Sequence, residues 1–161
     1  MKLLTVSPLL LAMMALITAA GEGCTDTKFP SCPPGWTQYC NRCFYYVSQP
    51  MIWGDAQRNC QSMKANLASV HSPEEYQVIQ KVISDASKAS DRTWIGGTDG
   101  QQEGYWFWMD GTRLTYANWC PGEPSNSFGK ESCMEMNFSG NKCMNDETCS
   151  SKFPSVCVGR I

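Results

Sequence analysis

The stretch TWIGGTDGQQEGYWFWMDGT, residues 93–112, marks a change in the character of the chain. Its two ends, TWIGG and YWFWMDGT, are rich in aromatic and β-branched residues, which favours short strands, and the Gly and Asp residues beside them favour turns. Two later runs, CMEMNF at 133–138 and SVCVGRI at 155–161, have the same character. From residue 93 onward the sequence therefore predicts strands and no further helix.

Upstream of this stretch, two segments have helical character. The first spans residues 53–63, where apolar side chains recur at helical spacing; they are Trp53, Ala56, Cys60 and Met63. The second begins at SPEE, with Ser72 as N-cap, Pro73 at the first helical position and Glu75 completing a capping box. Its apolar face continues to about residue 86.

The order of these elements indicates the fold class. Before the helices, CPPGWTQYCNRCFYYV at 32–47 is typical of a turn that enters a strand. Two helices followed by a run of strands predict a single α+β domain over residues 32–161, with no repeat and no second domain. Residues 21–31 form a short polar segment before it.

The N-terminus indicates the compartment. MKLLTVSPLLLAMMALITAAGEG has one lysine, an apolar run and then small residues, so residues 1–20 are interpreted as a signal peptide cut near Ala20. A membrane anchor is the alternative, but the run is short for a span, and no other stretch is apolar enough. We therefore expect a secreted protein without membrane insertion. The formal net charge of −2 becomes −3 once Lys2 is removed, and no basic stripe exists, which argues against nucleic acid as a partner.

The sequence contains ten cysteines, all of them after residue 20. An even number of cysteines in an oxidising compartment predicts five disulfides. CNRC at residues 40–43 is also the kind of motif found in zinc sites and redox pairs, but the chain has no matching second CxxC.

Several motifs together resemble the C-type lectin-like domain family. They occur in the order that this family shows: WIGG at 94–97, WMDGT at 108–112, NW at 118–119 and ND at 145–146. NLASVHS at 66–72 and an additional cysteine pair make the chain most similar to small secreted fish lectins and the related type II antifreeze proteins. The resemblance covers residues 32 to about 158. It implies two helices packed on short, mostly antiparallel strands, with a long calcium-binding loop region.

The resemblance also implies a disulfide pairing. The family pairs correspond to Cys32–Cys43, Cys60–Cys157 and Cys133–Cys149, and the subgroup adds Cys120–Cys143. Cys24 and Cys40 are then left to pair with each other, which the family pattern does not dictate. A further pair found in some antifreeze relatives would correspond to Gly100 and Ser132, so this chain lacks it.

Two cysteine-bounded segments carry oxygen ligands: CPGEPSNSFGKESC at 120–133 and KCMNDETC at 142–149. Both are expected to be loops. Calcium takes six to eight oxygen ligands, and a bound cation would relieve repulsion between carboxylates held close together. The residues that the family uses for its primary calcium site correspond to Glu123, Ser125, Glu131, Asn145 and Asp146.

In this family the same residues bind sugar, because two vicinal hydroxyls complete the calcium shell. The tripeptide is Glu123-Pro124-Ser125 here, where relatives have Glu-Pro-Asn or Gln-Pro-Asp. The resemblance implies a cis peptide bond before Pro124 and, because Glu comes first, a mannose-type preference. Ser125 has a shorter arm than Asn, so we expect weak binding at each site.

Other residues admit more than one interpretation. Asp99, Glu103 and Asn126 correspond to an auxiliary calcium site of some relatives, although a solvated acidic loop would have the same composition. Asn137 lies in a glycosylation sequon, NFS, inside a predicted strand. His71 is the only histidine, and its place before the capping box favours a helix-entry role over catalysis.

Three function classes follow from these observations. The first is a calcium-dependent lectin that binds glycans, including those of microbes, with clustering of several copies to supply avidity. The second is an ice-binding protein of the type II kind, and the third is a calcium-independent module that binds proteins. An enzyme is disfavoured, because the sequence offers no pairing of a nucleophile with a base.

Overall fold

The computed structural model describes residues 30–161, which contain two α-helices and eight strands. The helices are α1 (Trp53–Ser62) and α2 (Pro73–Ser87), and a short 3-10 turn, η2, covers Ser127–Gly129. The strands are β1 (Thr37–Tyr39), β2 (Arg42–Met51), β3 (Asn66–Leu67), β4 (Thr93–Thr98), β5 (Phe107–Trp108), β6 (Cys133–Phe138), β7 (Cys143–Glu147) and β8 (Phe153–Arg160). The α+β prediction is confirmed. The predicted signal peptide lies outside the described residues.

The strands form one sheet with the order β1-β2-β8-β4-β6-β7; β3 pairs with β8, and β5 pairs with β4. All pairings between these strands are antiparallel except that of β4 with β8, which is parallel at Trp94 and Ser155. The expectation of a mostly antiparallel sheet is therefore confirmed.

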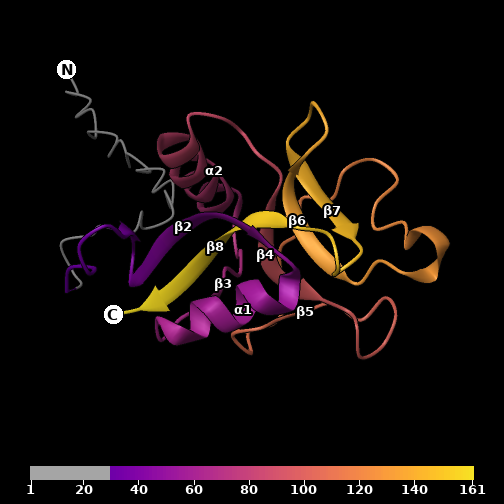
Figure 1. Ribbon diagram of the computed structural model, residues 1–161, viewed down its shortest axis with the longest axis horizontal. Coiled ribbons are helices and arrows are strands. Elements are labelled where there is room, and N and C mark those ends of the chain that lie inside the picture. The colour runs from indigo at the N-terminus through magenta and orange to yellow at the C-terminus, as the bar shows by residue number, and fades with distance from the viewer. Residues whose placement is uncertain (1–29) are drawn as a thin grey trace, which may run out of the picture.

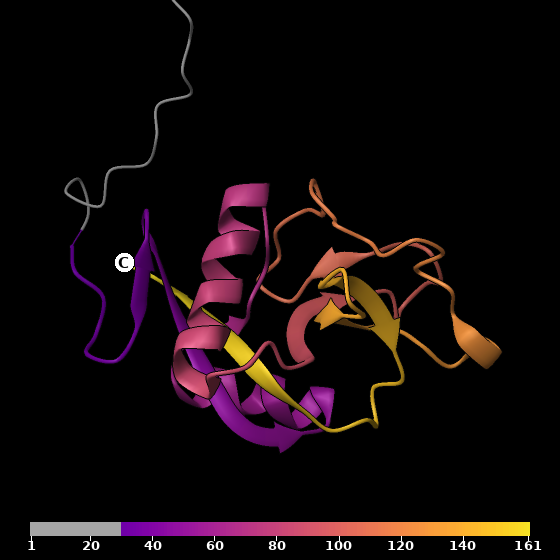
Figure 2. The ribbon, with the colours of Figure 1, turned by 90° about the horizontal axis from the view of Figure 1, so that it is seen from above.

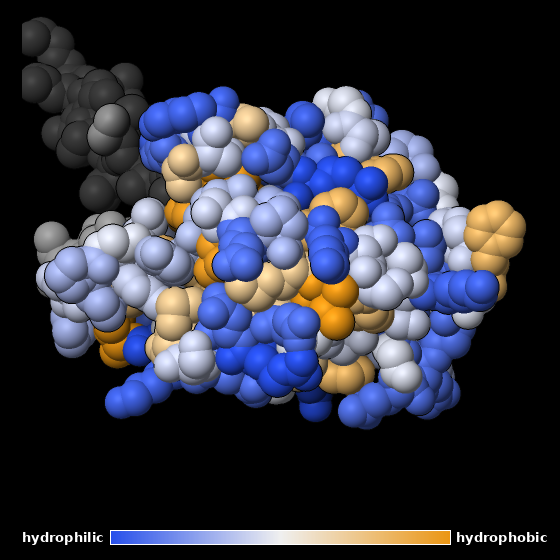
Figure 3. Space-filling model, in the orientation of Figure 1, coloured by the Kyte–Doolittle hydropathy of each residue, from blue (hydrophilic) through white to orange (hydrophobic). Residues whose placement is uncertain are grey.

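The two helices bury opposite sides of the sheet, one on each side of β2 and β8 (Figure 1). Successive side chains of a strand point to opposite faces. In β4, accordingly, Ile95 belongs to the hydrophobic cluster that contains Tyr76 and Ile83 of α2, whereas Trp94 belongs to the cluster that contains Ala56 of α1. With these clusters inside, polar residues cover most of the face in Figure 3, and apolar residues lie between them in separate groups.

The glycines of WIGG allow β4 to pack closely against its neighbours. A Cβ atom at Gly96 would lie 2.5 Å from the carbonyl oxygen of Leu67, and one at Gly97 would lie 2.5 Å from Cε of Met134. Neither space admits a larger side chain without a shift, so this part of the motif is explained by packing.

The start of α2 follows its sequence signal with one difference. The Ser72 Oγ accepts a hydrogen bond from the Glu75 backbone N–H at 3.1 Å, which confirms the N-cap. In a standard capping box the Glu75 carboxylate would accept from the backbone N–H of the cap residue, Ser72. Here it accepts instead from the backbone N–H of the preceding residue, His71, at 2.7 Å. The other oxygen of Glu75 forms an ion pair with Arg42, which draws the carboxylate toward β2.

The predictions for two segments, KCMNDETC and YWFWMDGT, need correction. KCMNDETC, expected to be a loop, contains strand β7, which pairs with β6. The polar side chains Asn145 and Asp146 gave no strand signal in the sequence. They fit into a strand here because they contact polar groups of β6 and of the neighbouring loop. In YWFWMDGT only Phe107–Trp108 is a strand, and β1 and β3 are short strands that the sequence did not indicate.

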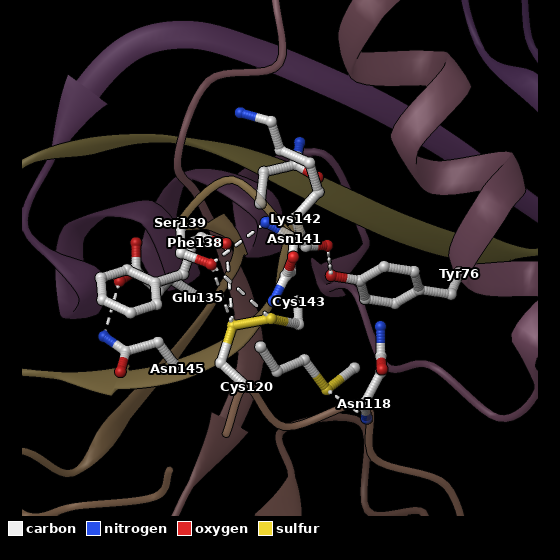
Figure 4. The surroundings of a disulfide bond; sticks show 12 residues. Tyr76, Asn118, Cys120, Glu135, Phe138, Ser139, Asn141, Lys142, Cys143 and Asn145 are labelled. Atoms are coloured by element: carbon white, nitrogen blue, oxygen red, sulfur yellow. Dashed lines mark hydrogen bonds between the residues drawn. A yellow bond between two sulfur atoms is a disulfide. The ribbon is translucent and has the colours of Figure 1, made fainter. Parts of the chain in front are cut away.

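Four of the five predicted disulfides are present: Cys32–Cys43, Cys60–Cys157, Cys120–Cys143 and Cys133–Cys149. Cys40 is also disulfide-bonded. Its expected partner, Cys24, lies outside the described residues, so the Cys24–Cys40 bridge stays a prediction. Figure 4 shows the Cys120–Cys143 bridge beside the chain segments that lead into β7.

The strands β6 and β7 and the long segment that precedes them lie at the end of the molecule away from the C-terminus, as Figures 1 and 2 both show. The two helices and the sheet centre thus form a base for these loops. Within residues 30–161, no helix has the length and apolar character needed to cross a membrane.

Candidate functional site

The segment between Cys120 and Cys133 is fastened at one end to β7 and at the other end to the residues just after β7. Cys120 is bridged to Cys143, its backbone N–H donates to the Met144 carbonyl oxygen at 2.9 Å, and Cys133 is bridged to Cys149. Within the segment the Glu123–Pro124 peptide bond is cis, as expected. The polar loop is therefore held beside the strand that carries Asn145 and Asp146.

Asp146 makes the central contact between strand and loop. Its carboxylate is buried and accepts hydrogen bonds from two successive backbone N–H groups, those of Ser125 at 2.9 Å and Asn126 at 2.7 Å. Ser125 and Asn126, two of the predicted site residues, thus contact a third, Asp146, through their backbone N–H groups.

Glu131 organises the other side of the same loop. Its carboxylate accepts from the Ser127 backbone N–H at 2.7 Å and from the Ser125 hydroxyl at 3.3 Å. Its own backbone N–H donates to the Asn126 side-chain oxygen at 3.2 Å. The Ser125 hydroxyl therefore already donates to a carboxylate, and it would have to leave Glu131 in order to donate to a sugar.

Glu123 lies where negative charge accumulates. Burial raises the pKa of its carboxyl; a hydrogen bond from Ser125 opposes this rise, and the neighbouring carboxylates of Asp146 and Glu131 add to it. Its Oε2 atom is buried and has no hydrogen-bond partner among the described residues. A bound cation would satisfy this oxygen and relieve the repulsion.

Asn145 is placed differently from the other predicted ligands. It is buried in β7, and its amide nitrogen donates to Glu135 of β6 at 2.8 Å. Its neighbour Asp146 faces the loop, because successive side chains of a strand point to opposite sides. No hydrogen bond within residues 30–161 joins Asn145 to the Glu123 loop. The structure therefore brings together Glu123, Ser125, Glu131 and Asp146.

These residues suit calcium in chemistry, although they do not form a closed cage. Within residues 30–161, no group of three acidic, histidine or cysteine side chains stands arranged to hold a metal. The Asp146 carboxylate is turned toward backbone N–H groups, whereas Glu123 Oε2 is a buried oxygen of the loop that has no partner among the described residues. The donor set consists of carboxylates, an amide and a hydroxyl, which are the hard oxygen ligands that calcium prefers. Of these residues, Glu123, Ser125, Glu131 and Asp146 are brought together and would hold the ion, whereas the Asn145 amide is engaged with Glu135.

The residues of the auxiliary site are only partly brought together. Asp99 is buried; one oxygen accepts from the Gly104 backbone N–H at 2.8 Å, and the other has no partner in the described part of the chain. Glu103 is exposed, and the Asn126 side chain is engaged with Glu131 instead.

Two other predicted features lie in the interior. Asn137 is buried, and its amide nitrogen, the atom that would carry a glycan, donates to the Asp91 carbonyl oxygen at 3.3 Å. In the folded chain this side chain is therefore unsuited to glycosylation. Of the aromatic run, Trp108 is buried and Trp106 packs edge-on against Trp119 with ring centres 5.0 Å apart.

One buried group behind the site was missed by the sequence analysis. Glu135 is fully buried, contacts Asn145 and forms an ion pair with Arg92. The one available signal was a charged residue inside the mostly apolar strand CMEMNF.

Two helices on opposite faces of a disulfide-linked sheet, with a long acidic loop fastened beside β7, define a C-type lectin-like domain. The sequence model of the Lectin C-type domain matches residues 49–159, and the chain belongs to this family. It is a family of binding domains and not of enzymes.

Several fish proteins are similar to this chain. Ladderlectin of Oncorhynchus mykiss is 45% identical over 124 residues, which are 77% of this chain and 65% of that protein. The galactose-specific lectin nattectin of Thalassophryne nattereri is 37% identical over 92% of both chains. The type-2 ice-structuring protein of Hemitripterus americanus is 36% identical over 97% of this chain and 98% of its own length.

Solved structures show the same relationship. The herring type II antifreeze protein has 38% sequence identity and a TM-score of 0.76, with 81% of this chain and 99% of that chain covered. A calcium-independent type II antifreeze protein has 35% identity and a TM-score of 0.73, covering 81% and 95% of the two chains.

Proposed function

We propose that this protein is a secreted, calcium-dependent lectin that binds carbohydrate at the loop between Cys120 and Cys133. The observation that carries the proposal is the Glu123 carboxylate next to Asp146 and Glu131, whose buried Oε2 has no hydrogen-bond partner in the part of the chain that the structure describes. Asp146 and Glu131 also bind backbone N–H groups of the loop, but the Glu123 oxygen has no such partner, and a bound cation would offset the cost of burying it. The similarity to a galactose-specific fish lectin supports carbohydrate as the ligand class.

The sugar preference that we propose is mannose-type and weak. Glu123 keeps the acceptor in the position that goes with mannose-type hydroxyls, and Ser125 supplies a donor on a short arm. We therefore expect dissociation constants in the millimolar range, about −4 kcal/mol per site. Useful avidity would then come from several linked copies, since linking raises the effective concentration. Galactose, the sugar of nattectin, is the competing outcome.

The test combines thermal unfolding with sugar competition. A ligand that binds only the folded state stabilises it, so millimolar calcium should raise the melting temperature and a chelator should lower it. Binding to immobilised glycans is then measured in calcium with free mannose or free galactose as competitor. Stronger inhibition by mannose supports the proposal, and stronger inhibition by galactose overturns the sugar preference but not the calcium site.

Ice binding is the second candidate, and the antifreeze relatives favour it. A herring type II antifreeze protein and a type-2 ice-structuring protein match nearly their whole lengths to this chain. An ice-growth assay on the same sample distinguishes the two functions: shaped ice crystals without glycan binding would replace the lectin assignment. A melting curve that does not respond to calcium, with neither glycan nor ice bound, would leave the calcium-independent module that binds proteins.

A further inference from the structure

Two adjoining cavities lie at the end of the molecule that carries the C-terminus. The larger, of about 380 Å³, lies between the start of β2, the end of β8 and the segment that joins α1 to β3; the smaller has about 220 Å³. Lys64, Gly159 and Arg160 line both cavities, which therefore share a wall. Figure 1 shows the ends of α1 and β8 together on this side, away from the loop between Cys120 and Cys133.

Strand register gathers positive charge in the larger cavity. Arg160 lies directly opposite Arg42 in the pairing of β8 with β2. On the other side of β8, Asn66 of β3 lies opposite Val158. Continued by two residues, this register brings Lys64 beside Arg160, and both line the cavity. Like charges that face each other across a sheet destabilise the pairing, so an anion at this place would be stabilising.

Arg42 differs from the other two cations of the cavity. It is buried, forms an ion pair with Glu75, and has the carboxylate of Asp110 4.0 Å from its Nη2. Lys64 and Arg160 are exposed, and within residues 30–161 neither of them forms an ion pair. These two side chains therefore offer charged hydrogen-bond donors to an anion from outside the chain.

The smaller cavity adds an apolar surface. Besides the shared residues, its lining is mainly apolar: Pro33, Trp36, Cys43, Met63 and Ile161. The half-buried indole ring of Trp36 packs on Tyr45, with ring centres 5.2 Å apart. A Cβ atom built on Gly159 would lie 3.9 Å from Cζ3 of this ring, so the ring lies beside the wall that the cavities share.

We propose that the two cavities form one binding site for an anionic sugar, whose charged group lies between Lys64 and Arg160 and whose ring lies on Trp36. A pyranose ring has a face of C–H groups that suits an indole, and a sulfate or carboxylate on the ring suits the two cations. The volumes lie at the lower end of the usual range for ligand pockets, roughly 300–1,000 Å³, which limits the ligand to one or two rings. This site is separate from the calcium-dependent loop proposed above.

The test is a titration of the full chain in chelator, at constant ionic strength and followed by NMR. Galactose 6-sulfate or glucuronate should bind about 10-fold more tightly than galactose, which lacks the charge that contacts both cations. Equal affinities for the charged and uncharged sugars would overturn the proposal. So would equally tight binding of inorganic sulfate, which has no ring, or tighter binding of octanoate, which has an apolar tail instead. Because chelator removes calcium, the outcome does not depend on whether glycan binds at the loop.

His71 shows whether the anion binds in this place. Its pKa is lowered by burial and next by Arg42, and Arg160 lowers it further. Glu75 and Asp110 act in the opposite direction. An anion beside Arg160 offsets positive charge, so galactose 6-sulfate should raise the pKa of His71, whereas galactose should not. The chain has one histidine, which makes its ring signals unambiguous. Binding that leaves the pKa of His71 unchanged would contradict this location.

Lys64→Gly removes one of the two cations at a position whose backbone suits glycine. Lys64 follows the C-cap of α1 with a φ of 60°, in the left-handed region. Lys88→Gly is the matched control, because Lys88 ends α2, also with a φ of 60°, and lines neither cavity. Lys64→Gly should weaken the binding of galactose 6-sulfate about 10-fold, and Lys88→Gly should leave it unchanged. Equal affinities in the two variants would overturn the role of Lys64.

Gly159→Val tests whether the two cavities act as one site. Valine is favoured in strands, and 3.9 Å from Trp36 is an ordinary contact distance, so the melting temperature should be kept. The added side chain would occupy the space beside the ring of Trp36. We expect the affinity for galactose 6-sulfate to fall toward that for inorganic sulfate; an unchanged affinity for the sugar would show that the ring does not lie there and would overturn the proposal.

Discussion

Asp146 has two separable properties, its charge and its two hydrogen-bond acceptors. Because its carboxylate binds the backbone N–H groups of Ser125 and Asn126, it holds the loop in place without an ion. Asp146→Asn removes a full charge and leaves one acceptor oxygen for two N–H groups. We expect the calcium-induced rise in melting temperature to be almost abolished. Asp110→Asn is the control: Asp110 also accepts several hydrogen bonds, from Ser69 and Thr112, but lies outside the loop, so its calcium response should persist.

Ser125 is the residue at which this chain departs from the family pattern. Its hydroxyl donates to Glu131 at 3.3 Å, and a longer amide would extend the donor toward a sugar hydroxyl. We therefore expect Ser125→Asn to strengthen mannose binding, measured by inhibition of binding to an immobilised mannoside in calcium. Glu123→Gln combined with Ser125→Asp should shift the preference toward galactose. An unchanged order of the two sugars in the combined variant would argue against control by donor and acceptor order.

We expect His71 to make the stability of the protein depend on pH. Its pKa is lowered, mainly by burial and next by the positive charge of Arg42. Near and below the ordinary pKa of 6.5, the unfolded chain therefore binds more protons than the folded chain, so the free energy of unfolding falls as the pH falls. His71→Gln should reduce this loss between about pH 7 and pH 5, as followed by urea unfolding. Because the chain has one histidine, identical slopes in both proteins would exclude this origin.

The candidate site could be predicted at the level of residues but not of their contacts. Glu123, Glu131 and Asp146 could be named because their side chains stand at recognisable spacings in a polar segment. The contacts of Glu135 could not, because its partners lie 43 residues away in Arg92 and 10 residues away in Asn145. Hydrogen-bond partners across strands depend on register, which composition does not determine.

Among the elements, α2 has the best-defined start, and its cap can be tested alone. The Ser72 Oγ accepts from the Glu75 N–H, one of the four N–H groups at the helix start that lack helical partners. Ser72→Ala should therefore lower the free energy of unfolding by about 1 kcal/mol. Ser84→Ala is the control, since its exposed hydroxyl bonds only a carbonyl oxygen within the helix. Urea unfolding measures both, and equal stabilities would contradict the capping role.

The helices were predicted closely, and the strands less so. Helical spacing repeats within one element, so residues 53–63 and the SPEE segment revealed α1 and α2 from local sequence alone. Strand β7 escaped because its stabilising partners lie elsewhere: Cys143 and Met144 are held by the Cys120 segment, and Asn145 by Glu135. A polar edge strand is thus defined by its neighbours and not by its own pattern.

At the scale of the whole molecule, the two ends are held together in different ways. The sheet centre and helices hold the N- and C-terminal strands together, with β2 and β8 paired through most of their length. The opposite end carries β6, β7 and the loop, and the disulfides there fasten loop to strand (Figures 1 and 2). Changes to the loop should therefore alter binding with limited effect on the core, whereas changes to the base should alter stability.

Two disulfides of the base can test whether changes to the base alter the stability of the protein. Cys60–Cys157 joins α1 to β8 across 97 residues of chain, whereas Cys32–Cys43 closes a loop of 11. In the chain-entropy model, stabilisation grows with the logarithm of loop length, which favours the longer bridge by roughly 2 kcal/mol. Replacing both Cys60 and Cys157 by Ala should thus lower the free energy of unfolding by more than replacing both Cys32 and Cys43.

Burial acts in the same direction as loop length. Cys60 and Cys157 are fully buried in the cluster under α1, so their replacement also removes packing contacts. Urea unfolding of the two double variants measures the difference, and mutating each pair together avoids a free thiol. A larger loss from the Cys32–Cys43 pair would show that the N-terminal hairpin, and not the tie between α1 and β8, determines the stability of the base.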